Sequence, residues 1–114
     1  MSVYDKAREL VDALQQDEVY TEFIQYQREV YQDSQYKEML LSLRNKEFAL
    51  NRQQLLGKEV GEEEKEELRR LYEIARHNPV VGGYLDAEYK FSRMMMDIQK
   101  IINDAVPVQR PDRS

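Results

Sequence analysis

The sequence has 114 residues, of which 41% are hydrophobic and 34% are charged, and its formal net charge is −5. A chain of this length can bury one hydrophobic core, and its four glycines and three prolines offer little turn material for a many-stranded β fold. We therefore expect a single all-α domain, and the negative charge argues against direct binding to nucleic acid, whose phosphates are held by clustered Lys and Arg.

Residues 2–32 predict two short helices. Ser2 occupies an N-cap position, where its hydroxyl can accept from the free amides of a first helical turn. The apolar face of this first helix comprises Val3, Ala7, Leu10, Val11 and Leu14. Asp17 is the expected N-cap of a second helix, over residues 18–32, whose apolar side chains recur at alternating helical spacing. The two glutamines before Asp17 are good helix formers, so a helix that continues through this point is the alternative.

A long third helix is predicted from Gln35 to Leu56. Ser34 is its expected N-cap, and Gly57 follows its end, where glycine is favoured because it adopts a left-handed conformation without strain. Its main apolar row comprises Tyr36, Leu40 and Leu43. Phe48 and Leu55 lie on a neighbouring row, so we expect this helix to meet different neighbours along its length.

The segment 57–61 is predicted to be a loop, and the next helix begins with three glutamates, whose charge complements the positive end of a helix dipole. Arg76 and His77 stand at the opposite end of this helix. Its apolar face comprises Leu68, Leu71 and Ala75. Asn78-Pro79 marks the next boundary, because proline disfavours the helical conformation in the residue before it and fits well in a first turn.

The strongest pattern is that of the last helix, predicted from Pro79 to about Val106. Its apolar residues alternate in steps of four and three without a gap, which is typical of a helix that packs along a continuous seam. At about 1.5 Å per residue it would span about 42 Å, more than a compact domain of this size needs. We therefore predict a helical bundle that is completed by dimerisation, with residues 1–106 as one domain and 107–114 as a flexible tail.

The seam provides the predicted interface. It comprises Val80, Tyr84, Ala87, Phe91, Met94, Met95, Ile98, Ile101 and Ile102. The alternative for its aromatic and methionine side chains is burial in the core of the same chain. Three tyrosines that lie off the main apolar rows are candidate contacts for other proteins, namely Tyr31, Tyr72 and Tyr89. Glu88 stands beside the seam, where it would either pair with an arginine or remain at an exposed rim.

No catalytic, cofactor-binding or metal-binding residue is predicted. Glu73 and His77 share one helix face, but His77 is the only histidine and a metal site needs more ligands, so we interpret it as a favourable charge at a helix end. The glutamates at 62–67 lack the spacing of a calcium-binding loop and are interpreted as a solvated helix start. The absence of cysteine and of a long apolar run indicates a cytoplasmic protein that neither spans a membrane nor carries a signal peptide.

The last helix resembles the C-terminal helix of the bacterial YlbF/YmcA family, which includes YheA-like proteins. The matching run is NPVVGGYLDAEYKFSRMMMDIQKII, residues 78–102, with YLDAE as its most recognisable part. Two earlier segments are also similar to the family, VYTEFIQYQREV and NRQQLLGKEVGEEE. The sequence is most similar to the YheA-like branch.

This resemblance implies an all-helical, dimeric, cytoplasmic protein without catalytic activity that acts as a protein-interaction or regulatory adaptor. In some family members this role lies in a complex that affects RNA processing, competence and development. An iron–sulfur cluster accompanies that complex, but this chain has no cysteine to ligate one, so a cluster would belong to a partner. The alternatives are a structural homodimer, an enzyme or a small-ligand-binding protein.

Overall fold

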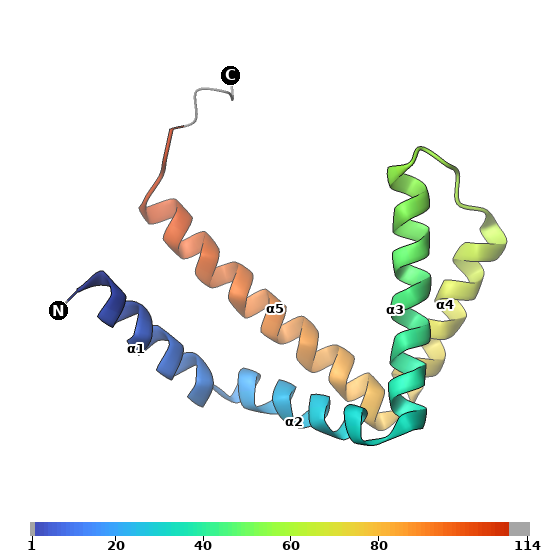
Figure 1. Ribbon diagram of the computed structural model, residues 1–114, viewed down its shortest axis with the longest axis horizontal. Helices are drawn as coiled ribbons and strands as arrows, with labels where there is room; N and C mark the ends of the chain where they lie inside the picture. The colour runs from blue at the N-terminus through green and yellow to red at the C-terminus, as the bar shows by residue number, and fades with distance from the viewer. Residues whose placement is uncertain (1, 110–114) are drawn as a thin grey trace.

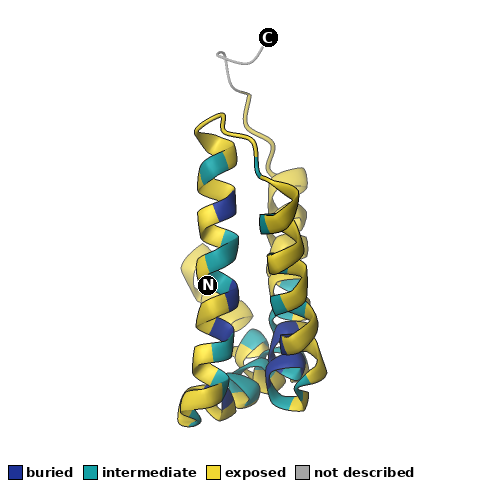
Figure 2. Cartoon of the chain, turned by 90° about the vertical axis from the view of Figure 1, so that its right-hand side faces the viewer, coloured by how far each residue is buried: buried dark blue, intermediate teal, exposed yellow. Residues whose placement is uncertain are grey.

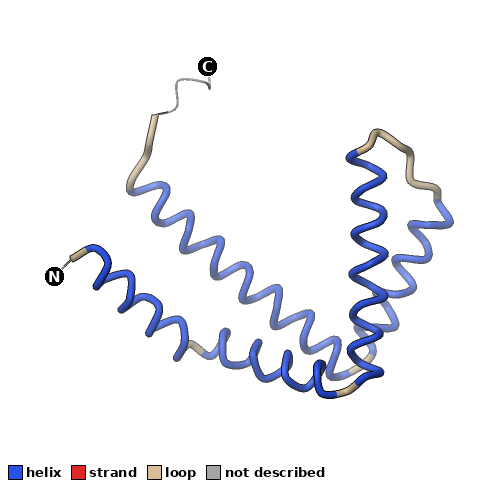
Figure 3. The backbone as a smooth tube through the Cα atoms, in the orientation of Figure 1, coloured by secondary structure: helices blue, strands red, loops and turns tan. Residues whose placement is uncertain are grey.

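The computed structural model describes residues 2–109, and these form five α-helices connected by short loops (Figure 3). The helices are α1 (Val3–Gln16), α2 (Glu18–Gln32), α3 (Ser34–Leu55), α4 (Glu62–His77) and α5 (Pro79–Ala105). No strand occurs among the described residues. The predicted all-α class is therefore confirmed, and each helix begins and ends within about two residues of its predicted bounds. Of the predicted tail 107–114, residues 110–114 lie outside the described part of the chain.

Side-chain caps fix the breaks between consecutive helices. The predicted break before α2 is present, and Oδ1 of Asp17 accepts a hydrogen bond from the amide of Val19 at 2.8 Å. The predicted cap of α3 is wrong by one residue. Ser34 is already helical, and Asp33 is the cap, because its carboxylate accepts from the amide of Gln35 at 2.9 Å and from that of Tyr36 at 3.1 Å. Gly57, with φ of +76°, ends α3 as expected.

The helices form the two arms of a V (Figure 1). One arm contains α1 and α2 beside α5, and the other is the antiparallel hairpin of α3 and α4. The radius of gyration is 18.7 Å, whereas a compact domain of this length would have about 13 Å. Helix α5 is covered unevenly, because α3 and α4 contact its beginning and then lead away from it in the second arm.

The hydrophobic core lies where the arms meet. Its fully buried members are Val30, Leu43, Ala75 and Val81, which come from four different helices. Figure 2 shows that buried residues gather at this end of the molecule, while the far ends of the helices are mostly exposed. Gly82 permits the close approach of α5 to α4, because a Cβ atom there would lie 2.6 Å from the main-chain oxygen of Arg76.

Aromatic side chains join α2 to α5 beyond this core. The rings of Phe23 and Phe91 are stacked with centroids 5.1 Å apart, and Phe23 also stacks on Tyr84 at 5.6 Å. Tyr20 adds a tilted contact with Phe91 at 5.7 Å. The apolar stripe of α2 thus packs on the first half of the α5 seam, and these contacts fix the arm of the V that α5 forms.

Candidate interaction surfaces

The predicted interface residues fall into two groups along α5. Tyr84 and Ala87 are buried in the core of the chain itself, and Val80, Phe91, Met94 and Ile98 are partly buried. The second group, near the end of the helix, remains exposed and comprises Met95, Ile101 and Ile102. The apolar residues of α2 recur with the same helical period and pack on the first half of the α5 seam. The second half of the seam has no such cover from α2. Tyr84 and Ala87 are packing residues in this fold, and a partner can reach only the second half.

Two of the three candidate contact tyrosines are well exposed. Tyr31 lies at the end of α2, where the ammonium of Lys37 stands 6.0 Å from its ring centroid, and Tyr89 lies on α5. Tyr72 differs from the expectation and packs, partly buried, against the core. It precedes the fully buried Ala75 by three residues, so both side chains share one face of α4.

Helix α1 presents an apolar face that no other helix covers. Among the described helices it packs only against α2, and each of its residues from Val3 to Ala13 is exposed. Its N-terminus is nonetheless well formed, because the hydroxyl of Ser2 accepts from the amide of Asp5 at 3.1 Å and the Asp5 carboxylate accepts from the amide of Ser2 at 3.2 Å. An ordered amphipathic helix whose apolar face is largely uncovered is typical of a surface that binds a protein.

A second uncovered row runs along α3. It comprises Leu41, Phe48 and Leu55, which recur every seven residues and are all exposed. Sequence reasoning placed Phe48 and Leu55 on a secondary row of this helix but assigned the interface to α5 alone. The seven-residue spacing, which is typical of helices that pack along a partner helix, was the available signal for an interface here.

A polar cluster joins the two arms at the base of the V. Glu88 accepts hydrogen bonds from Arg44 of α3 and from the hydroxyl of Tyr84, the latter at 3.2 Å, and Arg44 also contacts Glu47 at 3.3 Å. Of the two alternatives for Glu88, an arginine pair or an exposed rim, the structure shows the arginine pair, and the arginine belongs to the same chain. Burial raises the pKa of the Tyr84 hydroxyl, and the adjacent Glu88 charge raises it further.

The same cluster keeps Arg44 charged. Its partial burial alone would lower its pKa, but the hydrogen bond and charge of Glu88 outweigh this effect, and the net shift is upward. A protonated tyrosine, a charged arginine and a paired carboxylate hold α3 and α5 together.

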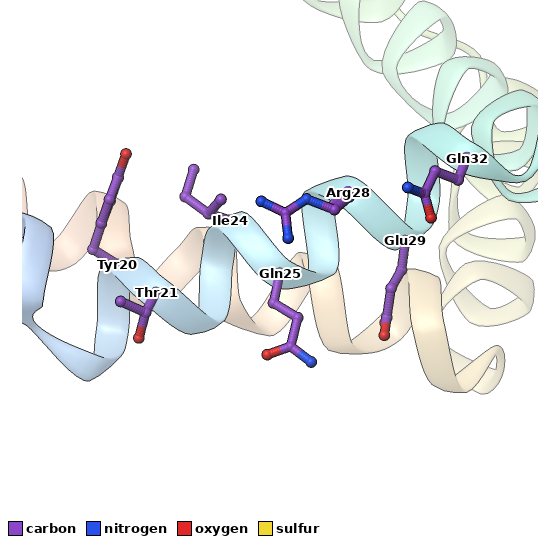
Figure 4. Close-up of a pocket in the computed structure, with 7 residues that line it drawn as sticks. All are labelled: Tyr20, Thr21, Ile24, Gln25, Arg28, Glu29 and Gln32. Carbon is purple, nitrogen blue, oxygen red and sulfur yellow. The ribbon is translucent and has the colours of Figure 1, made fainter.

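A shallow hollow lies on the surface of α2. It has a volume of about 480 Å³. Its lining consists of Tyr20, Thr21, Ile24, Gln25, Arg28, Glu29 and Gln32. All of these side chains come from α2 (Figure 4). A ligand there would touch a single helix and remain largely in water, unlike the buried ligands of typical small-molecule sites.

The described residues contain no group of three or more His, Cys, Asp or Glu side chains arranged to hold a metal ion. The ring of His77 is engaged locally, with its Nδ1 atom 2.7 Å from the main-chain oxygen of Glu73. Among residues 2–109 no helix is long and apolar enough to cross a membrane.

Comparison with known proteins places this architecture in a family. Residues 3–107 match the family model described as "Control of competence regulator ComK, YlbF/YmcA". A UPF0342 protein of Desulfitobacterium hafniense is 32% identical over 106 residues, which are 93% of this chain and 86% of that protein. A UPF0342 protein of Caldicellulosiruptor bescii is 33% identical over 105 residues, 92% of this chain and 88% of the relative.

The fold has also been seen in a solved structure. A protein of unknown function (DUF964) from Bacillus stearothermophilus superposes with a TM-score of 0.80 at 19% sequence identity, and the match covers 91% of each chain. The resemblance of the last helix and of the two earlier segments to the YlbF/YmcA proteins is therefore confirmed over nearly the whole length of the chain. This protein belongs to the YlbF/YmcA family.

Proposed function

We propose that this protein is a non-catalytic interaction adaptor of the cytoplasm that works as a homodimer. The observation that carries this proposal is its exposed surface. The chain exposes 9404 Å², whereas a compact monomer of this length would expose about 6,600 Å². Stable homodimers bury about 2,000 Å² or more in total, about 1,000 Å² from each partner. The excess of about 2,800 Å² is large enough to supply such an interface.

The character of this surface supports an interface with protein. Uncovered apolar side chains are concentrated on α1, on the α3 row and on the end of α5. Monomeric proteins rarely leave apolar surface of this extent in contact with water. The hollow on α2 is open and lined by a single helix, and the polar cluster of Arg44, Tyr84 and Glu88 is occupied in joining the two arms. These features favour an adaptor over an enzyme.

The regulatory part of the proposal rests on the family. Its description names control of the competence regulator ComK, and we propose that this chain acts in the same class of process by holding other proteins in a complex. Exposed tyrosines suit contacts with partners, since they combine a large apolar ring with a hydroxyl. Tyr31 and Tyr89 are the proposed contact residues, and any influence on RNA processing would act through partners. A structural homodimer without other partners is the alternative.

The proposal is tested in two steps with the full-length chain. Light scattering after gel filtration first determines its mass across the micromolar range, where a dimer is expected. Proteins retained by the tagged chain from native cytosol, with nuclease present, are then purified and mixed with it again. Stoichiometric binding that weakens at least tenfold in Tyr89→Ala, while Lys58→Ala as an exposed control in the loop between α3 and α4 binds normally, supports the adaptor. A dimer that retains no protein leaves the structural alternative.

A further inference from the structure

The face of α5 that packs on α2 continues, uncovered, towards the end of the helix. Tyr84 stacks on Phe23 of α2, and Ile102 follows Tyr84 by eighteen residues, which is five full turns of an α-helix. The same interval separates Ile101 from Gly83, where a Cβ atom would collide with a tyrosine ring of α2. Ile101 and Ile102 therefore lie on the α2 side of α5, yet they are 68% and 45% exposed.

This uncovered surface has the same spacing as the part of α5 that α2 covers. Along α5 the apolar positions advance by four, three and four residues in two successive sets. The first set comprises Val80, Tyr84, Ala87 and Phe91, and the second, which we call the distal row, comprises Met94, Ile98, Ile101 and Ala105. The first two members of the distal row are partly buried, and the last two are exposed. The distal row can therefore accept a further helix with the spacing of α2.

Helix α1 has this spacing and no helix to cover its apolar stripe. The stripe advances by four, three and four residues and comprises Val3, Ala7, Leu10 and Leu14. The stripe of α2 has the same steps and comprises Val19, Phe23, Tyr26 and Val30. Of the α1 stripe only Leu14 is partly buried, and the other three residues are exposed. The chain thus contains a stripe and a row of matching period, and neither is fully covered.

The junction between α1 and α2 keeps these two surfaces apart in the single chain. Asp17 has an extended backbone, with φ of −71° and ψ of 140°, and its carboxylate caps α2 through the amide of Val19. This capped break ends the line of α2, and α1 lies apart from α5 without contacting it (Figure 1). The distal row is consequently left for a helix of another molecule.

We propose that α1 of one copy packs on the distal row of α5 in a second copy, and that α1 of the second copy packs on the distal row of the first. This pairing rests on the proposed function, because it assigns the interface of the proposed dimer to the end of the arm that contains α1 and α5. The α3 row of Leu41, Phe48 and Leu55 lies outside this interface.

Three observations favour a second copy over another helical protein. Each chain supplies one uncovered stripe and one uncovered row, so two copies related by a twofold axis use all four and leave none for a third copy. The α1 stripe also has the same steps as the α2 stripe, which packs on the adjoining half of the seam. The excess exposed area of about 2,800 Å² per chain is more than the area of about 1,000 Å² that each partner buries in a stable homodimer.

Charge substitutions at positions of matched exposure test the assignment. Leu10→Asp places a carboxylate on the α1 stripe, and Ile101→Asp places one on the distal row. Met96→Asp is the control, because Met96 is 67% exposed but lies about 140° around the helix axis from Ile101. All three positions are exposed in the single chain, so circular dichroism is expected to show the wild-type helix content in each variant. We expect light scattering to give half the wild-type mass for Leu10→Asp and Ile101→Asp, and the full dimer mass for Met96→Asp.

Mixing two variants tests which helices meet. Leu10→Asp and Ile101→Lys are each expected to be monomeric. In their mixed dimer the introduced carboxylate and ammonium share one of the two contacts between α1 and α5, and the other contact is wild type. We therefore expect the mixture to form a dimer at concentrations at which neither variant does so alone. If α1 packed on α1 and α5 on α5, each contact would contain one introduced charge, so a mixture that remains monomeric overturns the pairing.

The outcomes separate this pairing from the proposed function. A wild-type protein that is monomeric across the micromolar range overturns both. A wild-type dimer that persists in Leu10→Asp or in Ile101→Asp overturns the pairing and leaves the dimer standing, as does a dimer that is also lost in Met96→Asp. A dimer that is lost in the first two variants and kept in Met96→Asp supports the pairing.

Thiol labelling gives a second readout that does not depend on breaking the dimer. The sequence contains no cysteine, so Ile101→Cys and Met96→Cys each carry a single reactive group at positions of nearly equal exposure in the single chain. We expect Ile101→Cys to react with a thiol reagent at least tenfold more slowly than Met96→Cys at high protein concentration, and the difference to shrink on dilution. Equal rates at every concentration in a protein that is dimeric would overturn the distal row as part of the interface.

Discussion

Arg44 of α3 and Glu88 of α5 form an ion pair that joins the two arms of the V at its base, across 44 positions of the chain. The two side chains are about one-third exposed, so water weakens their attraction only in part. Tyr84 donates to the same carboxylate, so a tyrosine that is buried in the core also contacts the ion pair between the arms. The pair thus ties α3 to α5 at the edge of the hydrophobic core.

Removing the charge of Glu88 should reduce the stability of the junction. Glu88→Gln keeps an acceptor for Tyr84 but leaves Arg44 with Glu47 as its only remaining carboxylate. We expect a loss of about 1 kcal/mol in the free energy of unfolding, measured by urea denaturation. Lys100→Gln is the control, because its pair with Asp104 is well exposed and should change stability by only a few tenths of a kcal/mol. Equal losses in the two variants would contradict a specific role for the junction.

The raised pKa of Tyr84 should make the free energy of unfolding depend on pH in the alkaline range. Its pKa is raised in the folded chain by burial and by the charge of Glu88, so the folded protein keeps the phenolic proton more tightly than the unfolded chain does. This contribution is fully present below the ordinary tyrosine pKa of about 10 and is lost as pH rises through the higher folded value.

In Tyr84→Phe the free energy of unfolding should therefore decline less steeply above about pH 9 than in the wild type, although the variant is less stable at neutral pH by about 1 kcal/mol. Tyr89→Phe, at an exposed position, serves as the control and should keep the wild-type slope. Chemical denaturation at a series of pH values measures both slopes. Identical slopes for the wild type and Tyr84→Phe would exclude this titration.

Gly82 should resist substitution although it lies in a helix. Alanine normally stabilises a helix interior by about 1 kcal/mol relative to glycine, but here its Cβ would meet the main-chain oxygen of Arg76 at 2.6 Å. The backbone has to move, and we expect Gly82→Ala to lower the free energy of unfolding by about 1–3 kcal/mol. At Gly61 a Cβ meets nothing within 4 Å, so Gly61→Ala should cost only about 0.5 kcal/mol, from the weaker N-cap. Thermal unfolding compares the two.

The helices were predictable from local signals. The spacing of apolar residues, the capping residues, and the helix boundaries at Gly57 and Pro79 each depend on only a few neighbouring residues. The neighbour of each apolar row was not predictable in this way. The period of α5 identifies its buried face, but it does not reveal that α2 covers Tyr84 and Ala87 and leaves Met95 exposed. The row of Leu41, Phe48 and Leu55 is a similar case. Its sequence spacing is the same whether the helix that covers it belongs to this chain or to another protein.

Contacts between residues that lie far apart in the sequence could not be predicted either. The sequence indicates that a carboxylate beside an apolar seam needs a partner, yet nothing near Glu88 identifies Arg44, which the turn into α3 brings to it. Tyr72 shows the same limit, since its position off the main row suggested exposure. Its side chain packs against the core because α4 is contacted by both α3 and α5, which widens the face that is covered.

The N-cap of α3 can be tested at two adjacent residues, because the structure places the cap at Asp33 and not at the expected Ser34. Asp33 accepts from two free amides of the first turn, whereas Ser34 is exposed and already helical. Asp33→Ala should therefore lower the free energy of unfolding by about 1 kcal/mol. Ser34→Ala should be neutral or stabilising by a few tenths of a kcal/mol, because alanine is the better helix former. Urea denaturation of the two variants distinguishes the caps, and a larger loss in Ser34→Ala would restore Ser34 as the cap of α3.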